Sequence, residues 1–294
     1  MNNENRTLTY ILVLLIIVWT VMPIYWMLNL SLQFETTIFA TPTSFVPPAP
    51  TDFWYRRILS IPTRENITMS GGSVGSMTAE HVGRGIRNSI LVAIPVSIAA
   101  IAVASLSGYA FGRLKFRFKN GYLFLLLASQ TLPPVAVILP FYIMFQTLNL
   151  LGSIYGLMIV YLSLIIPLVT WILIGFFAGL PVEVERAARI DGCGRLAALR
   201  RVIFPMAAPG IMAGWAFAFL TSYNEFMFAW ILTVGSSAET LPPALTGLFF
   251  MDTTVPEMSA AVILSLIPVV LFALLLQKYV TELRIVDPIT TVVG

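Results

Sequence analysis

Residues 120–182, NGYLFLLLASQTLPPVAVILPFYIMFQTLNLLGSIYGLMIVYLSLIIPLVTWILIGFFAGLPV, contain no charged side chain. A helix needs about 20 mostly apolar residues to cross the hydrocarbon core of a bilayer. This stretch is too long for one such helix, and the more polar segment QTLNLLGS (146–153) interrupts it. We therefore predict two membrane-spanning helices, one on either side of that segment.

The rest of the chain also has the composition of a membrane protein. Of its 294 residues, 58% are hydrophobic and 11% are charged, whereas about 25% are charged in an ordinary soluble domain. Four further apolar stretches complete the prediction of an all-α membrane protein with six transmembrane helices, in a single transmembrane domain over residues 1–294. The predicted spans are about 8–32, 88–112, 120–145, 153–178, 207–232 and 257–278.

The lysines and arginines predict the orientation of these spans. In a six-span topology, twelve of the seventeen basic residues fall on one side, together with both termini, and cytoplasmic loops hold the excess of such residues. Both termini are therefore predicted to be cytoplasmic, and the long loop over 33–86 to be external. The length of this loop favours a surface that meets an external partner or gates a pore, with a plain linker as the alternative.

Several kinds of chemistry have no signature in this sequence. There is no GxxxxGK[ST] loop for nucleotide phosphates, no HExxH pair and no cluster of Cys and His residues. The chain is therefore predicted not to be an enzyme, with no catalytic residue, no metal site and no cofactor of its own. Its basic residues are scattered between apolar spans rather than gathered with aromatic residues, which argues against nucleic acid as a partner.

One ionisable residue lies inside a predicted span. Glu225, in TSYNEF, falls in the outer third of the fifth span, where a charge usually faces the bundle interior or a water-filled path. With Tyr223 and Asn224 it forms a polar girdle that can line a route for a hydroxyl-rich solute. The alternative is that Glu225 caps a neighbouring helix or reaches the outer interface. Asn88 and Gln130 are further candidates for the path, although neutral amides often only bridge helices.

The densest run of charge lies between the fourth and fifth spans, in LPVEVERAARIDGCGRLAALRRVIFPMAAPG (180–210). Pro181 suits a helix start, Gly192 and Gly194 break that helix, and a second short helix is predicted over about 195–203. By their helical spacing, three small apolar residues share a face of the first helix: Val184, Ala187 and Ala188. This loop, 180–205, is predicted to dock a cytoplasmic partner; an interfacial helix held by anionic lipid is the alternative.

The loop resembles a known signature, E-A-A-x-x-D-G followed by a distant I-x-L-P, found in inner-membrane permeases of binding-protein-dependent ABC importers. Phe204 stands where that signature has its leucine. The residues that match are Ala187, Ala188, Asp191, Gly192 and Pro205. The segments NSIL (88–91), SGYAFGRLKF (107–116) and SYNEF (222–226) are similar to the carbohydrate-uptake branch, specifically to the second permease of maltose-type importers. The resemblance covers roughly residues 85–280.

This resemblance implies a type I ABC importer permease fold in a bacterial inner membrane, with a cytoplasmic coupling helix between spans four and five. It also implies a set of partners: a second permease, two copies of an ATPase that bind ATP and Mg²⁺, an extracytoplasmic solute-binding protein, membrane lipid and a sugar, expected to be a di- or oligosaccharide. The residues implied to couple to the ATPase are Glu185, Arg186, Ala187, Ala188, Asp191 and Gly192.

The chain departs from the family pattern in two places. Arg186 occupies the position of the glutamate that starts the signature, and Glu185 lies one residue, about 100° of helix, out of register. The tail RIVDPITTVVG (284–294) only loosely matches the usual glycine-rich ending. A secondary transporter or channel subunit for a polar solute, or a structural membrane scaffold, is kept as the alternative function.

Overall fold

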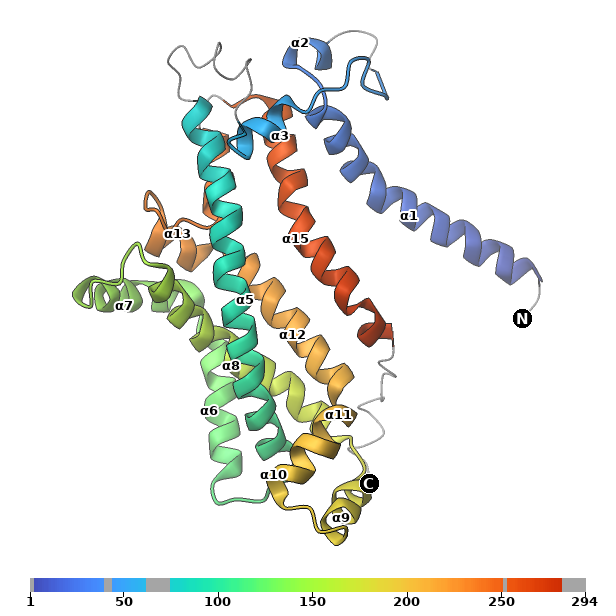
Figure 1. Cartoon of the computed structure of the whole chain (residues 1–294), viewed down its shortest axis with the longest axis vertical. Coiled ribbons are helices and arrows are strands. Elements are labelled where there is room, and N and C mark those ends of the chain that lie inside the picture. The colour runs from blue at the N-terminus through green and yellow to red at the C-terminus, as the bar shows by residue number, and fades with distance from the viewer. Residues whose placement is uncertain (1–2, 40–43, 62–74, 251–252, 282–294) are drawn as a thin grey trace. The chain divides into compact units, whose positions relative to one another are not determined.

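The computed structural model describes residues 3–39, 44–61, 75–250 and 253–281, and every regular element in these ranges is a helix (Figure 1). Four helices are long and apolar enough to cross a membrane: Leu8–Ser31, Glu80–Arg113, Ile154–Ala178 and Val255–Lys278. Two bent helix pairs raise this number to six if each pair is one span. The predicted six spans are thus the upper end of the structural range.

The chain divides into two compact units, residues 1–86 with 243–267 and residues 87–242 with 268–294. Three helices pass from one unit to the other along the chain. They are α5 (Gly75–Arg113), α14 (Leu241–Phe250) and α15 (Val255–Thr281).

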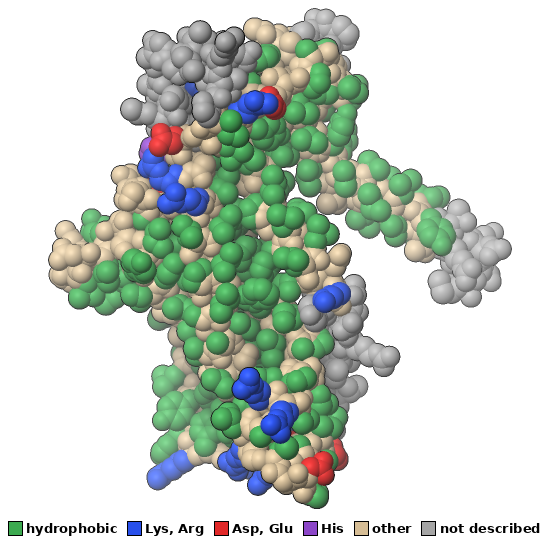
Figure 2. Space-filling model, in the orientation of Figure 1, with side chains coloured by type: hydrophobic (Ala, Val, Ile, Leu, Met, Phe, Trp, Pro, Cys, Tyr) green, Lys and Arg blue, Asp and Glu red, His purple; other side chains and the backbone are tan. Residues whose placement is uncertain are grey.

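The first unit begins with α1 (Asn3–Ser31), which contains the first predicted span. Every side chain from residue 8 to residue 25 is exposed, and most of them are apolar (Figure 2). A helix that is apolar on all sides suits a lipid or protein environment rather than water. At the C-terminal end of the helix, Asn29 is polar and buried. Its side chain donates hydrogen bonds to the carbonyls of Ser44 (3.2 Å) and Phe45 (2.9 Å).

The loop predicted over 33–86 contains helices, α2 (Glu35–Ile38) and α3 (Phe53–Ile58). In α3, the Trp54 indole donates to the Gln33 carbonyl (2.9 Å), and Arg57 pairs with Glu257 of α15 (3.7 Å). A Cβ atom added to Gly83 would lie 2.4 Å from the Ile58 carbonyl oxygen, so α5 needs a glycine where it meets α3. The described part of this loop is therefore folded.

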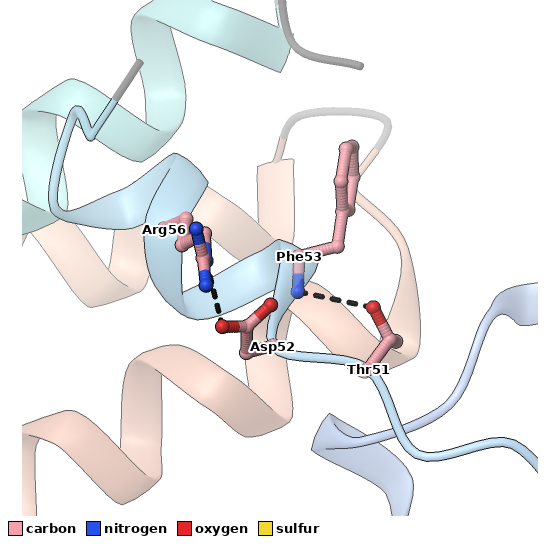
Figure 3. Close-up of polar contacts among 4 residues, drawn as sticks. All are labelled: Thr51, Asp52, Phe53 and Arg56. Atoms are coloured by element: carbon pink, nitrogen blue, oxygen red, sulfur yellow. Dashed lines mark hydrogen bonds and ion pairs between the residues drawn. The ribbon is translucent and has the colours of Figure 1, made fainter. Parts of the chain in front are cut away.

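The start of α3 is held locally (Figure 3). The Thr51 hydroxyl accepts a hydrogen bond from the Phe53 amide (3.2 Å), and the Arg56 guanidinium pairs with the Asp52 carboxylate (2.6 Å). Such exposed i,i+4 pairs stabilise a helix by only about 0.3–0.5 kcal/mol. The burial of Phe53, Trp54 and Ile58 is the larger contribution to the position of α3.

The second unit is built around α8 (Ile154–Ala178), which packs against α6 (Lys119–Thr131), α12 (Ala208–Tyr223) and α13 (Met227–Thr233). The glycines of α5 and α12 allow close helix approach, as small residues do in membrane bundles. A Cβ on Gly108 would lie 2.8 Å from Leu173 Cβ, and one on Gly210 would lie 2.4 Å from Phe176 Cγ.

The third predicted span, 120–145, is two helices rather than one. α6 ends at Thr131, α7 (Pro134–Thr147) follows, and the two are bent by 92°. The cause is the pair Pro133 and Pro134, because a residue before proline is pushed into extended conformation. Leu132 and Pro133 are indeed extended, with ψ of 123° and 130°.

The fifth predicted span, 207–232, is also interrupted. α12 ends at Tyr223 and α13 begins at Met227, so residues 224–226 are not helical. Residues 195–206 and α12 are bent by 76° at Ala207. In contrast, the fourth and sixth predicted spans, 153–178 and 257–278, correspond closely to α8 and α15, and the second predicted span lies inside the longer α5.

Candidate coupling segment and polar site

The charged loop forms a helix, a tight turn and a second helical stretch, as its glycines predict. The helix α9 (Val182–Ile190) follows Pro181 and has Glu183 and Glu185 in its first turn, where carboxylates favour the positive end of the helix dipole. It is followed by α10 (Arg195–Ala198), a π-helical turn over Leu199–Ile203 and α11 (Phe204–Met206). In Figure 1, α9 and α10 lie next to each other in the yellow part of the ribbon.

Gly192 ends α9 in a Schellman motif. The Cys193 amide donates to the Ala188 carbonyl (3.0 Å), and the Gly192 amide donates to the Arg189 carbonyl (3.2 Å), which is the bonding pattern of that motif. Gly192 has φ of +87°, a conformation that is costly for any residue with a Cβ atom. The sharp turn therefore requires glycine at this position for its backbone alone, since nothing lies within 4 Å of an added Cβ.

Two polar contacts hold α9 against the end of α5. The Tyr109 hydroxyl donates to the Glu185 carboxylate (2.9 Å), and the Arg113 guanidinium donates to the Pro181 carbonyl (3.1 Å). The Tyr109 ring meets Phe177 of α8 edge-on at a centroid distance of 6.0 Å. Because Tyr109 is only 8% exposed, this contact is set by packing on both sides. Sequence reasoning identified Glu185 but not Tyr109 or Arg113.

The face of α9 that points outward differs from the predicted one. Ala188 is buried, at 7% exposure, so the strip of Val184, Ala187 and Ala188 does not face a partner as a whole. Arg186 and Ala187 are exposed, and Ile190 is 85% exposed. Across the turn a second large aliphatic side chain is exposed, Leu196 at 76%.

This outward surface, Arg186, Ala187, Ile190 and Leu196, is basic and apolar. In the sequence, this surface could have been predicted from two large aliphatic residues, Ile190 and Leu196, that flank the glycine turn. Asp191 is also exposed, and its backbone is the C-cap of α9, with its amide donating to the Ala187 carbonyl (2.9 Å).

Glu225 caps a helix, as the alternative reading proposed. Its two carboxylate oxygens accept hydrogen bonds from the amides of Phe228 (3.0 Å) and Ala229 (3.1 Å) at the start of α13. The Tyr161 hydroxyl of α8 donates to the Glu225 carbonyl at 3.4 Å. A carboxylate in this place satisfies amides that the helix leaves unbonded and favours the positive end of its dipole.

The remaining path candidates are not gathered at one place. Tyr223 is buried and its ring stacks on Phe219, whereas Asn224 is exposed and its amide donates to the carbonyl of Leu220 in its own helix (2.9 Å). Gln130 is exposed and donates to the Leu164 carbonyl of α8 (3.3 Å).

Asn88 has a clear packing role. Its side chain is 1% exposed and donates to the carbonyls of Ser237 and Glu239, both at 2.8 Å. The next residue, Ser89, accepts a hydrogen bond from the Leu241 amide (2.9 Å). Together these bonds fix the segment between α13 and α14 against α5. In the described residues, no group of three or more His, Cys, Asp or Glu side chains could hold a metal ion.

Several apolar helices of spanning length, with breaks in the third and fifth predicted spans, define the class of protein: a multi-pass membrane protein with an exposed two-helix segment between α8 and α12. The chain belongs to the family described as the binding-protein-dependent transport system inner membrane component, which matches residues 100–284. That range includes α9, Gly192 and Glu225.

Curated relatives match over most of their length. The chain is 29% identical to the sulfoquinovosyl glycerol transport system permease protein of Agrobacterium fabrum, over 95% of this chain and 92% of the relative. It is 28% identical to the trehalose/maltose transport system permease protein of Thermococcus litoralis, over 95% and 94%.

The fold is also similar to a solved structure. A chain of a bacterial ABC transporter involved in the import of the acidic polysaccharide alginate superposes with a TM-score of 0.71 at 17% identity. The similarity covers 95% of this chain and 99% of the other. The chain therefore has the fold of an ABC importer permease.

Proposed function

We propose that this chain is a permease subunit of an ATP-driven ABC importer for a sugar, a di- or oligosaccharide. The observation that carries the proposal is the match over nine-tenths of the chain to permeases named for trehalose/maltose and for a glycosylated glycerol. The comparisons give no support to the alternative of a secondary transporter or channel. The orientation follows the basic residues, with both termini in the cytoplasm of a bacterial cell.

On this proposal, α9 and α10 couple the membrane helices to a cytoplasmic ATPase. The outward surface defined above exposes two large aliphatic side chains, Ile190 and Leu196, and apolar residues are typical of the core of an interface. Arg186 stands beside it, where the resembled signature has glutamate, so the ATPase groove would present an acid to this position. ATP and Mg²⁺ would be bound by that partner, because this sequence has no P-loop.

Glu185 has a different role in this proposal. Its carboxylate bonds to Tyr109 of the same chain, so it positions α9 rather than contacting the ATPase. Movement of the docked segment would then be passed directly to α5 through Tyr109 and through Arg113. A coupling element has to be held rigidly by several contacts, because a loosely packed segment would move without moving the membrane helices.

Two further partners are proposed. A second permease would complete the path and cover apolar membrane helices such as α1, whose side chains are exposed in the single chain. An extracytoplasmic solute-binding protein would meet the folded external segment that contains α3. The sugar path would be shared with the second permease, with the exposed amides of Asn224 and Gln130 as candidates on this chain, and with Glu225 acting as a helix cap beside it.

Uptake by the assembled complex tests the proposal. The permease, its second permease, the ATPase and the binding protein are reconstituted in liposomes with labelled trehalose, maltose, chitobiose or an amino acid. We expect ATP-dependent accumulation of at least one saccharide and none of the amino acid. Accumulation that follows an ion gradient and ignores ATP would contradict the proposal.

A further inference from the structure

The loop that joins α5 to α6 alternates basic and aromatic residues. It reads RLKFRFKNG (113–121), and its exposed side chains include Lys115, Phe116, Arg117 and Phe118. On one side it follows the apolar span of α5; on the other it leads into α6, where Tyr122 is 53% exposed and Phe124 is 70% exposed. Because both flanking helices are apolar enough for a lipid environment, we expect the loop to lie at the membrane surface.

An open hollow of about 500 Å³ lies on this loop. Its lining combines two ammonium groups, two phenyl rings, a side-chain amide and a glycine: Lys115, Lys119, Phe116, Phe118, Asn120 and Gly121. This combination fits a molecule that has an anionic group and an apolar part next to each other. A phospholipid headgroup with the start of its acyl chains has that composition, and aromatic rings at the headgroup level are typical of membrane proteins.

The charges of this loop are not neutralised by acids of the described chain. The salt bridges found in the described residues lie elsewhere in the chain: they join Arg56 to Asp52, Arg57 to Glu257 and Arg84 to Glu80. Arg117 instead lies over the ring of Phe118 at 4.7 Å. No acidic residue occurs between residues 113 and 182, and the carboxylate of Glu185 bonds to Tyr109.

Arg113 differs from the other three basic residues of the loop. Its guanidinium donates to the Pro181 carbonyl and so belongs to the coupling segment. That leaves Lys115, Arg117 and Lys119 as three neighbouring positive charges at a membrane surface. Basic clusters directly beside a transmembrane helix attract anionic lipids, with about 1 kcal/mol for each lysine or arginine near the surface.

We propose that residues 115–121 bind the headgroup of an anionic phospholipid. Lys115 and Lys119 contact its phosphate, Arg117 adds to the positive field, and Phe116 and Phe118 insert beside the first methylene groups of the acyl chains. The apolar helices on both sides favour a lipid over a soluble anion, since a lipid contacts the rings and the charges together. This inference does not depend on the transported solute or on the ATPase.

Native mass spectrometry of the purified full-length chain tests the site. The chain is taken from nanodiscs of phosphatidylcholine that contain a fifth of phosphatidylglycerol, and the phosphatidylglycerol retained per chain is counted. With about 1 kcal/mol for each of the two charges, the K115Q/K119Q variant should retain this lipid about thirty-fold less at low occupancy. The variant K115R/K119R should retain it, which separates loss of charge from loss of folding.

The matched control removes two exposed arginines from the π-helical turn, R200Q/R201Q, and should leave retention within two-fold. Equal loss in both variants would show a general charge effect and overturn the site. Displacement of the lipid by inorganic phosphate would assign the hollow to a soluble anion and also overturn it. Unchanged retention in K115Q/K119Q, with loss of the ATPase from the assembled complex, would assign the loop to a protein contact instead.

Discussion

The hydroxyl of Tyr109 on α5 donates a 2.9 Å hydrogen bond to the carboxylate of Glu185 on α9. This bond joins a membrane helix to the short segment that carries the family signature. Glu185 is one residue before the usual glutamate position, and its place on α9 turns it towards its own chain while Arg186 is exposed. The carboxylate that is out of register thus has a partner, and the arginine faces outward.

Removal of that bond should loosen the coupling segment without unfolding the protein. In Y109F the ring keeps its contact with Phe177 and only the hydroxyl is lost. The hydrogen bond that this hydroxyl makes is expected to stabilise the segment by about 1–3 kcal/mol, which the variant loses. We expect the ATP hydrolysed per imported sugar to rise several-fold in reconstituted complex, with normal assembly. The matched control is Y122F, at an exposed tyrosine of α6, which should not change this ratio.

A double-mutant cycle makes this prediction specific. E185Q keeps an acceptor for the Tyr109 hydroxyl and should be close to wild type, whereas E185A should resemble Y109F. The double variant Y109F/E185A should be no worse than either single variant, because both remove the same bond. Additive losses would show that the two residues act separately and would contradict the positioning role.

The turn after α9 gives a prediction about backbone conformation. Gly192 has φ of +87°, and G192A forces a Cβ atom into the left-handed region at a cost of about 1–2 kcal/mol. The α9–α10 turn should open, and the affinity for the ATPase should fall about ten-fold in a pull-down titration. The control is G194A, since Gly194 has φ of −65° and open space around its Cβ position. Equal effects of the two variants would contradict the requirement for glycine.

The cap at Glu225 predicts a stability effect that is separable from transport. E225A leaves two amides of α13 unbonded, for which about 1 kcal/mol of destabilisation is typical, and should lower the unfolding temperature of the solubilised protein by a few degrees. E225Q keeps one acceptor oxygen and should lie between the wild type and E225A. If E225Q instead abolished uptake at an unchanged unfolding temperature, the negative charge of Glu225 would be needed for translocation of the sugar, and the role as a helix cap alone would be contradicted.

Close packing at Gly210 can be tested by adding a methyl group. In G210A the new Cβ atom would meet Phe176 Cγ at 2.4 Å, so the ring must move, at a cost of about 1–3 kcal/mol. The thermal stability of the solubilised protein should fall, and F176L should restore part of it. G175A on the same helix as Phe176, where nothing lies within 4 Å of the added atom, is the control and should be neutral.

The sequence predicts the long spans well because length and lack of charge decide them. The break at Leu132 had a local signal, the two prolines that follow it, but the uncharged run on both sides hid its effect. The break at 224–226 has neither glycine nor proline. It depends on the cap by Glu225 and on the contact with Tyr161, which lies 64 residues earlier, and a tertiary contact of that kind leaves no local pattern.

The sequence predicted the helix, glycine turn and second helical stretch between α8 and α12, but it did not predict which face of α9 is buried. Helical spacing puts Ala187 and Ala188 near one face of α9 but does not say which of them meets the chain's own helices. The contacts with Tyr109 and Arg113 fix that rotation, with Ala188 buried and Ile190 exposed. The same rotation decides that Glu185 points inward.

The measurement that tests the proposed function most directly is co-purification from native membranes in a mild detergent. The wild-type chain should bring down a P-loop ATPase in stoichiometric amount, and the variant I190D/L196D should lose it while remaining in the membrane fraction. The outward control T147D, at an exposed threonine of α7, should retain the ATPase. Absence of any ATPase with the wild-type chain, or its undiminished recovery with I190D/L196D, would contradict the coupling role of this segment.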